Sequence, residues 1–185
     1  RETALLLFVE MEKTKNFGSS LIRDTLNKYD YENPREKAFL KRLAEGTLES
    51  LLTLDYVINA YSKTPTNKMK PLIRSLLRLS VYQILYMDTV PDSAACNEAV
   101  RLAKKKGFER LSGFVNGVLR TITRNKEEIL NSESGFWQEL QKNPVQALSV
   151  RYSVPEWMIS LWEAQYGEEK TEPMLERLKN GDRKS

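Results

Sequence analysis

The 185-residue chain has 41% hydrophobic and 29% charged residues, a composition that excludes a disordered chain and is typical of a globular protein. Its charge is uneven: residues 1–126 carry 22 basic and 14 acidic side chains, a net charge of +8, whereas residues 127–185 carry 7 and 11, a net charge of −4. The basic first part favours a polyanionic partner, although solvated surface charge alone gives the same excess. Because Cys96 has no second cysteine and no secretory or transmembrane stretch is evident, we expect a cytoplasmic protein without a membrane partner.

Hydrophobic periodicity predicts helices along the whole chain and no β-strand, so we expect an all-α fold. Residues 1–13 form a short amphipathic helix, and a second helix starts at Ser19 or Ser20 and reaches Tyr29. Asn33 is a good N-cap before Pro34, and the apolar spacing that follows predicts one long helix ending near residue 62.

The stretch at residues 71–88 is predicted to be the central helix of this fold. It is apolar over most of its circumference and leaves one polar strip, formed by Arg74, Ser75 and Arg78. A helix of this kind must be surrounded by other helices, and with two arginines it is too short and too polar to span a bilayer comfortably.

Two further helices follow, one ending at Gly107 and one with a regular apolar period from Leu111 to Ile122. We place a domain boundary after residue 132, which gives a helical bundle at residues 1–132 and a short helical extension at residues 133–185. In the extension, Trp157 and Trp162 lie on one face of a short helix and need a partner to cover them.

The sequence offers little for catalysis. It has no histidine, no glycine-rich nucleotide-binding loop and no metal-ligand spacing. Cys96 is more simply explained as a small buried hydrophobe than as a nucleophile. Asn97, Glu98 and Asn116 are interpreted as buried structural partners of Arg120 or of helix ends rather than as catalytic groups. We therefore expect no catalytic residue, metal or cofactor site in these 185 residues.

Two stretches are rich in basic residues and poor in acidic ones. Residues 56–87 contain five basic residues and no acid, and residues 101–126 contain eight and one acid. A helix C-terminus favours lysines in any case, but two such stretches in one domain favour nucleic-acid binding. The candidate RNA contacts are Lys68, Lys70, Arg74, Arg78, Lys104, Lys105, Lys106, Arg120 and Arg124.

Residues 73–122 resemble the NusB family of small helical RNA-binding proteins. The resemblance rests on R-x-x-L-R-L-x-x-Y at residues 74–82, N-E-A-V at residues 97–100 and F-V-N-G-V-L at residues 114–119. Arg1 matches part of the family's basic first helix and becomes a further candidate RNA contact. The resemblance implies a NusB-like helical bundle over residues 1–126.

The sequence RYSVPEWMISLWEAQYG at residues 151–167 resembles the entry to the catalytic part of the ribosomal RNA small subunit methyltransferase B family. That resemblance implies an RNA-binding, substrate-positioning domain of a monomeric 16S rRNA (cytosine-5)-methyltransferase. The catalytic cysteines and the S-adenosylmethionine site are then expected beyond Ser185, in the chain's own methyltransferase domain. Cys96 matches neither catalytic cysteine.

Two alternatives remain at this point. In the first, the chain is a protein-docking module like the NusB-type transcription antitermination factors. In the second, it is a structural spacer whose basic stretches are solvated surface.

Overall fold

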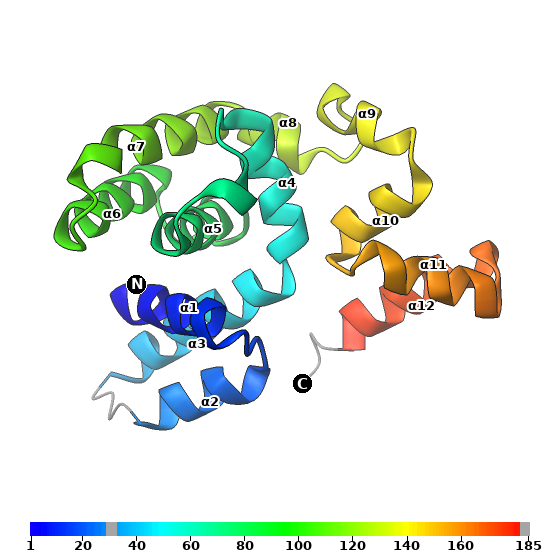
Figure 1. Ribbon diagram of the computed structural model, residues 1–185, viewed down its shortest axis with the longest axis horizontal. Helices are drawn as coiled ribbons and strands as arrows, with labels where there is room; N and C mark the ends of the chain where they lie inside the picture. Colours follow the sequence, from blue (N-terminus) through cyan, green and yellow to red (C-terminus); the bar gives the residue numbers. More distant parts are fainter. Residues whose placement is uncertain (29–32, 182–185) are drawn as a thin grey trace. The chain divides into compact units, whose positions relative to one another are not determined.

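The computed structural model describes residues 1–28 and 33–181, and every regular element among these residues is helical. The predicted all-α class is therefore confirmed. Tyr29, at the end of the predicted second helix, lies outside the described residues. The chain divides into two compact units, unit 1 at Arg1–Glu127 and unit 2 at Glu128–Ser185 (Figure 1).

Unit 1 is built around α5 (Pro71–Tyr86), which contacts α1, α3, α4, α6 and α7. Its side chains are buried around most of the helix, as the sequence predicted for residues 71–88. Ser75, expected on the polar strip, is fully buried, so only the two arginines form that strip. The other helices of unit 1 are α1 (Glu2–Thr14), α2 (Ser19–Lys28), α3 (Pro34–Glu49), α4 (Leu51–Tyr61), α6 (Asp92–Lys105) and α7 (Glu109–Arg124), and the 3₁₀ turn η1 spans Thr66–Lys68.

The single long helix predicted from Pro34 is in fact two helices, α3 and α4, which meet at Ser50. The Ser50 N–H donates to the Thr47 carbonyl, a 3₁₀-type bond, and the Ser50 carbonyl already accepts from the Leu54 N–H. The same residue thus ends one helix and begins the next. Both halves contact α5. The close packing of α3 on α5 also requires Gly46, because a Cβ there would overlap the Tyr82 ring.

A partly buried ion-pair network joins α1, α4 and α5. The Arg74 guanidinium donates to both Glu12 carboxylate oxygens, with Nε–Oε1 at 2.8 Å and Nη2–Oε2 at 2.6 Å. Arg78 makes the same two-pronged contact with Asp55 at 2.7 and 2.6 Å, and its Nη1 lies 3.2 Å from Glu12. These four side chains are between 8% and 19% exposed. The polar strip of the central helix therefore contacts carboxylates of the fold itself.

Unit 2 is a small helical unit that includes most of α8 (Lys126–Leu130). The Trp137 indole N–H donates to the Ile129 carbonyl at 3.0 Å, and the Ser134 hydroxyl donates to the Glu128 carbonyl at 2.6 Å. These bonds attach α8 to the second unit and place the division five residues before the boundary expected after residue 132. The remaining elements are η2 (Gly135–Trp137), α9 (Gln138–Gln141), α10 (Pro144–Tyr152), α11 (Glu156–Tyr166) and α12 (Glu168–Gly181).

The last three helices of unit 2 pack on one another, with Ile159 and Leu175 among their buried side chains. On the opposite side of α11, Trp157 is 67% exposed and Leu161 is 45% exposed. Among the described residues, no helix combines the length and the hydropathy needed to cross a membrane.

Removing the charge of Glu12 should destabilise unit 1 strongly. In Glu12→Gln the two arginines remain partly buried with one carboxylate fewer, so we expect a loss of about 3 kcal/mol in the free energy of unfolding. Glu10→Gln, on the exposed side of the same helix, should change it by less than about 0.5 kcal/mol. Urea unfolding followed by circular dichroism measures both, and equal changes for the two variants would contradict this role of Glu12.

Candidate RNA-binding surface

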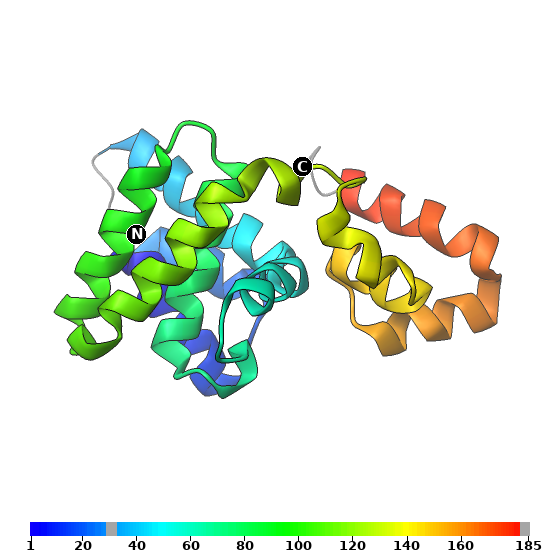
Figure 2. The same cartoon turned by 90° about the horizontal axis from the view of Figure 1, so that it is seen from above.

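Helices α6 and α7 lie side by side and form a helical hairpin (Figure 2). The chain turns between them at Gly107, whose φ of 86° lies in the region that suits glycine. The hairpin carries both of the motifs N-E-A-V and F-V-N-G-V-L. Its inner side is apolar, and Cys96 is fully buried there with its Sγ 3.9 Å from the Thr123 hydroxyl, as expected for a small buried hydrophobe.

A groove of about 330 Å³ runs between the two helices on their outer side. This hairpin groove is lined by Asn97, Val100, Ser112, Gly113, Asn116 and Arg120. Its volume lies at the lower end of the range found for small-molecule sites. The spacing of Ser112, Asn116 and Arg120, one helical turn apart, places them on one face of α7, a signal that the sequence contained and that our prediction did not use.

Arg120 holds the two amides of the hairpin groove. Its Nη2 donates to Asn97 Oδ1 at 3.0 Å and its Nε donates to Asn116 Oδ1 at 3.3 Å. The two asparagines are therefore partners of Arg120, but Asn97 is exposed and Asn116 is half-buried rather than buried. Glu98 has a different partner: it pairs with Arg101 at 2.6 Å, and this contact lowers the pKa of Glu98.

Arg124 lies one turn beyond Arg120 and is exposed, with its Nη2 donating to the Thr121 hydroxyl at 3.1 Å. Within the described residues, no carboxylate lies within ion-pair distance of Arg120 or Arg124. By contrast, Lys126 pairs with Asp92 at 3.2 Å. Two uncompensated guanidinium groups on one face can each bind a phosphate.

The three lysines near the hairpin turn have different surroundings. Lys105 and Lys106 both contact Glu2 of α1, at 2.8 and 2.7 Å, while Lys104 is exposed. Hydrogen bonds from the two lysines lower the pKa of Glu2 to about 2. Lys105 and Lys106 thus have a partner within the fold, in addition to the favourable dipole of α6.

Lys68 and Lys70 are exposed on the segment that leads into α5. The Lys70 ammonium lies 5.8 Å from the centre of the Phe108 ring, which brings it close to the turn end of the hairpin. Lys70 and Lys104 can therefore extend a positive surface from that end.

The remaining candidates from the sequence are half-buried and contact other groups of the bundle. Arg74 and Arg78 belong to the network with Glu12 and Asp55, so we assign them to the fold and not to the RNA-binding surface. The Arg1 Nε donates to Gln83 Oε1 at 2.7 Å, and the Arg1 guanidinium lies 5.4 Å from the centre of the Phe39 ring.

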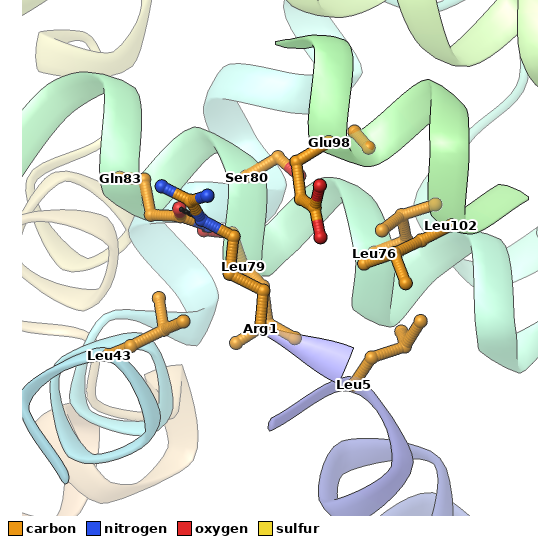
Figure 3. A pocket seen from close by; sticks show the side chains of 10 residues that line it. Arg1, Leu5, Leu43, Leu76, Leu79, Ser80, Gln83, Glu98 and Leu102 are labelled. Carbon is orange, nitrogen blue, oxygen red and sulfur yellow. Dashed lines mark hydrogen bonds between the residues drawn. The ribbon is translucent and has the colours of Figure 1, made fainter. Parts of the chain in front are cut away.

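Figure 3 shows Arg1, Gln83 and Glu98 around a cavity of about 10 Å³ between α1, α3, α5 and α6. That volume holds about one water molecule and no larger ligand. Among residues 1–28 and 33–181, no cluster of acidic or cysteine side chains could hold a metal ion.

Comparisons with known proteins identify the family of this chain. The profile of the NusB family matches residues 1–124, about two thirds of the chain, and the chain therefore belongs to the NusB family. The transcription antitermination protein NusB of Thermodesulfovibrio yellowstonii is 36% identical over 107 residues, which are 57% of this chain and 70% of that protein.

Two longer relatives match almost the whole chain. The probable ribosomal RNA small subunit methyltransferase B of Bacillus subtilis (strain 168) is 33% identical over 172 residues, which are 93% of this chain and 36% of that protein. The protein of the same name from Synechocystis sp. is 32% identical over 174 residues, 94% of this chain and 37% of its own length. This chain thus spans little more than a third of these two relatives.

The pairing of Glu2 predicts a specific pH dependence. Because its pKa is lowered in the folded state, its contribution to stability is present above about pH 4.5 and is lost as the pH falls towards 2. In Lys105→Ala/Lys106→Ala, the pKa of Glu2 should rise towards 4.5, the ordinary value for a glutamate.

A carboxyl titration by NMR checks this, with Lys104→Ala as the matched control because Lys104 does not contact Glu2. A Glu2 pKa that stays near 2 in the double variant would show that the two lysines are not its partners.

Proposed function

We propose that unit 1 is the RNA-binding domain of a ribosomal RNA small subunit methyltransferase and positions 16S rRNA for methylation of a cytosine at C5. The observation that carries this proposal is the extent of the methyltransferase alignments, which cover 93% and 94% of the chain and so include unit 2. The antitermination relative aligns over 57% of the chain, and the NusB profile ends at residue 124. Unit 2 is thus shared with the methyltransferases.

The described residues do not fit S-adenosylmethionine. The cavity of about 10 Å³ beside Arg1 is far too small for this cofactor. The hairpin groove has no carboxylate in its lining to bind the ribose hydroxyls or the ammonium group of the cofactor. In this proposal the cofactor belongs to a methyltransferase domain beyond the residues present here. The role of this chain is then to bind and orient the RNA, and the cytosine is extracted and modified elsewhere.

Phosphate contacts supply most of the binding in this proposal. Arg120 and Arg124 form one end of the surface, and Lys70 and Lys104 extend it at the turn end of the hairpin. Such contacts position an RNA strand without reading its sequence, and their strength falls steeply with salt.

The exposed face of α11 provides a contact for the methyltransferase domain. Trp157 and Leu161 lie one turn apart and are exposed, so they form an apolar pair that unit 2 does not cover. In this proposal, the partner is the part of the methyltransferase relatives that this chain does not span, nearly two thirds of their length.

Charge reversal on α7 tests RNA binding. Arg120→Glu/Arg124→Glu should weaken binding of single-stranded rRNA fragments at least tenfold and lower the slope of log affinity against log salt by about 1.4, since each phosphate contributes about 0.7. The matched control is Arg23→Glu/Lys28→Glu, the same change on exposed positions of α2. Fluorescence anisotropy across a salt series measures both, and equal losses for the two variants would remove Arg120 and Arg124 from the interface.

The methyltransferase activity is tested on the full-length natural protein. With labelled S-adenosylmethionine and undermodified 16S rRNA, we expect label at cytosine C5. Arg120→Glu/Arg124→Glu should raise the KM for RNA and leave the KM for S-adenosylmethionine unchanged. Absence of methyl transfer by the full-length wild type would overturn the proposed function.

A second candidate is the protein-docking role of an antitermination factor. The alignment that covers 70% of the Thermodesulfovibrio antitermination protein supports it. Charge reversal at Arg120 and Arg124 separates the two, because it should impair RNA binding and spare docking on a protein.

A further inference from the structure

The hairpin groove contains more than phosphate-binding groups. Val100 and Gly113 form apolar parts of its lining, and three polar side chains converge with the guanidinium of Arg120. A surface that bound only phosphates would need neither the apolar lining nor the two amides. An unpaired nucleobase has flat faces that suit apolar contact and an edge that suits amides.

The orientation of both amides follows from the chemistry of Arg120. A guanidinium has N–H donors and no acceptor, so each asparagine must turn its Oδ1 towards Arg120. The two Nδ2 groups are then left as donors. The Arg120 Nη1 adds further donors, since no hydrogen bond within the described residues involves it.

Ser112 adds only one acceptor to the excess of hydrogen-bond donors in the groove. Its hydroxyl hydrogen donates to the Glu109 carbonyl at 2.6 Å, so the hydroxyl offers the groove an acceptor only. The side chains of the groove therefore present mainly donors. A complementary base edge must present acceptors.

We propose that the hairpin groove binds an unpaired keto base, uracil or guanine, in preference to cytosine or adenine. Uracil presents O4, and guanine presents O6, as an acceptor at the position where cytosine and adenine carry an amino donor. The proposal rests on the RNA-binding function above and adds base selectivity to it. Arg124, one turn further along α7, lies close enough to hold a flanking phosphate.

The test compares fluorescein-labelled U10 and C10 oligonucleotides by fluorescence anisotropy. Uracil and cytosine have nearly the same size, and uracil carries the O4 acceptor where cytosine carries its amino donor. Wild type should bind U10 at least about fivefold more tightly than C10. Asn116→Asp keeps an oxygen for Arg120 and replaces the NH₂ donor by an acceptor, so the U10 to C10 ratio should fall at least fivefold.

A matched control and a second test variant make the result specific. Ser20→Asp adds the same charge on exposed α2 and should leave the U10 to C10 ratio unchanged. Asn97→Asp is a second variant of the same kind should Asn116→Asp fail to fold.

Filling the groove is an independent test. A Cβ at Gly113 meets nothing within 4 Å and Gly113 lines the groove, so the side chain of Gly113→Leu begins in open space and should occupy part of the groove and abolish the preference for U10. Gly117→Leu is the matched control, because Gly117 is equally open and does not line the groove.

The outcomes separate the two proposals. Equal binding of U10 and C10 by wild type overturns base selection in the groove and leaves RNA binding intact. Absence of binding to either oligonucleotide at low salt overturns the RNA-binding function as well. A preference for U10 that survives both Asn116→Asp and Gly113→Leu locates base selection elsewhere and overturns the role of the hairpin groove.

Discussion

The bundle depends on a partly buried ion-pair network in which Glu12 and Asp55 neutralise Arg74 and Arg78. These arginines form the charged strip of α5, and they contact carboxylates of α1 and α4. The contacts of Arg74 with Glu12 and of Arg78 with Asp55 each use two hydrogen bonds, which fixes geometry as well as charge. Arg74 also donates to the Thr66 and Met69 carbonyls, so the network holds the segment that leads into α5. Two arginines of the family motif thus serve the architecture.

Periodicity predicted the fold class, the central helix and the two helices that form the hairpin, because each depends on local spacing that survives in the folded chain. It did not predict the break at Ser50. The apolar spacing continues across that residue, and the helix ends there through a local 3₁₀ bond. No glycine or proline next to Ser50 signals this break in the sequence. The bonds that Trp137 and Ser134 make to α8 carbonyls are likewise tertiary contacts that spacing does not show.

The candidate site was less predictable, for a physical reason. Sequence shows where charges are but not which countercharges the fold brings to them. Glu2 is 103 positions from Lys105, and Glu12 is 62 positions from Arg74, so neither pairing could be inferred from spacing. What spacing could show, the single face of Ser112, Asn116 and Arg120, is where the hairpin groove lies. Of the ten basic candidates, the proposed function uses four that have no carboxylate partner among the described residues, which are Lys70, Lys104, Arg120 and Arg124.

The contact between Arg120 and two amides gives position 120 an influence beyond its own charge. A side-chain amide can accept or donate hydrogen bonds, so it turns its oxygen to a cation and its nitrogen to an anion. With a carboxylate at position 120, both asparagines would turn round and show oxygens where they now show nitrogens. One residue on α7 therefore sets the hydrogen-bonding polarity of the whole groove. Homologues with the same pair of asparagines can thus differ in ligand through a single change at position 120.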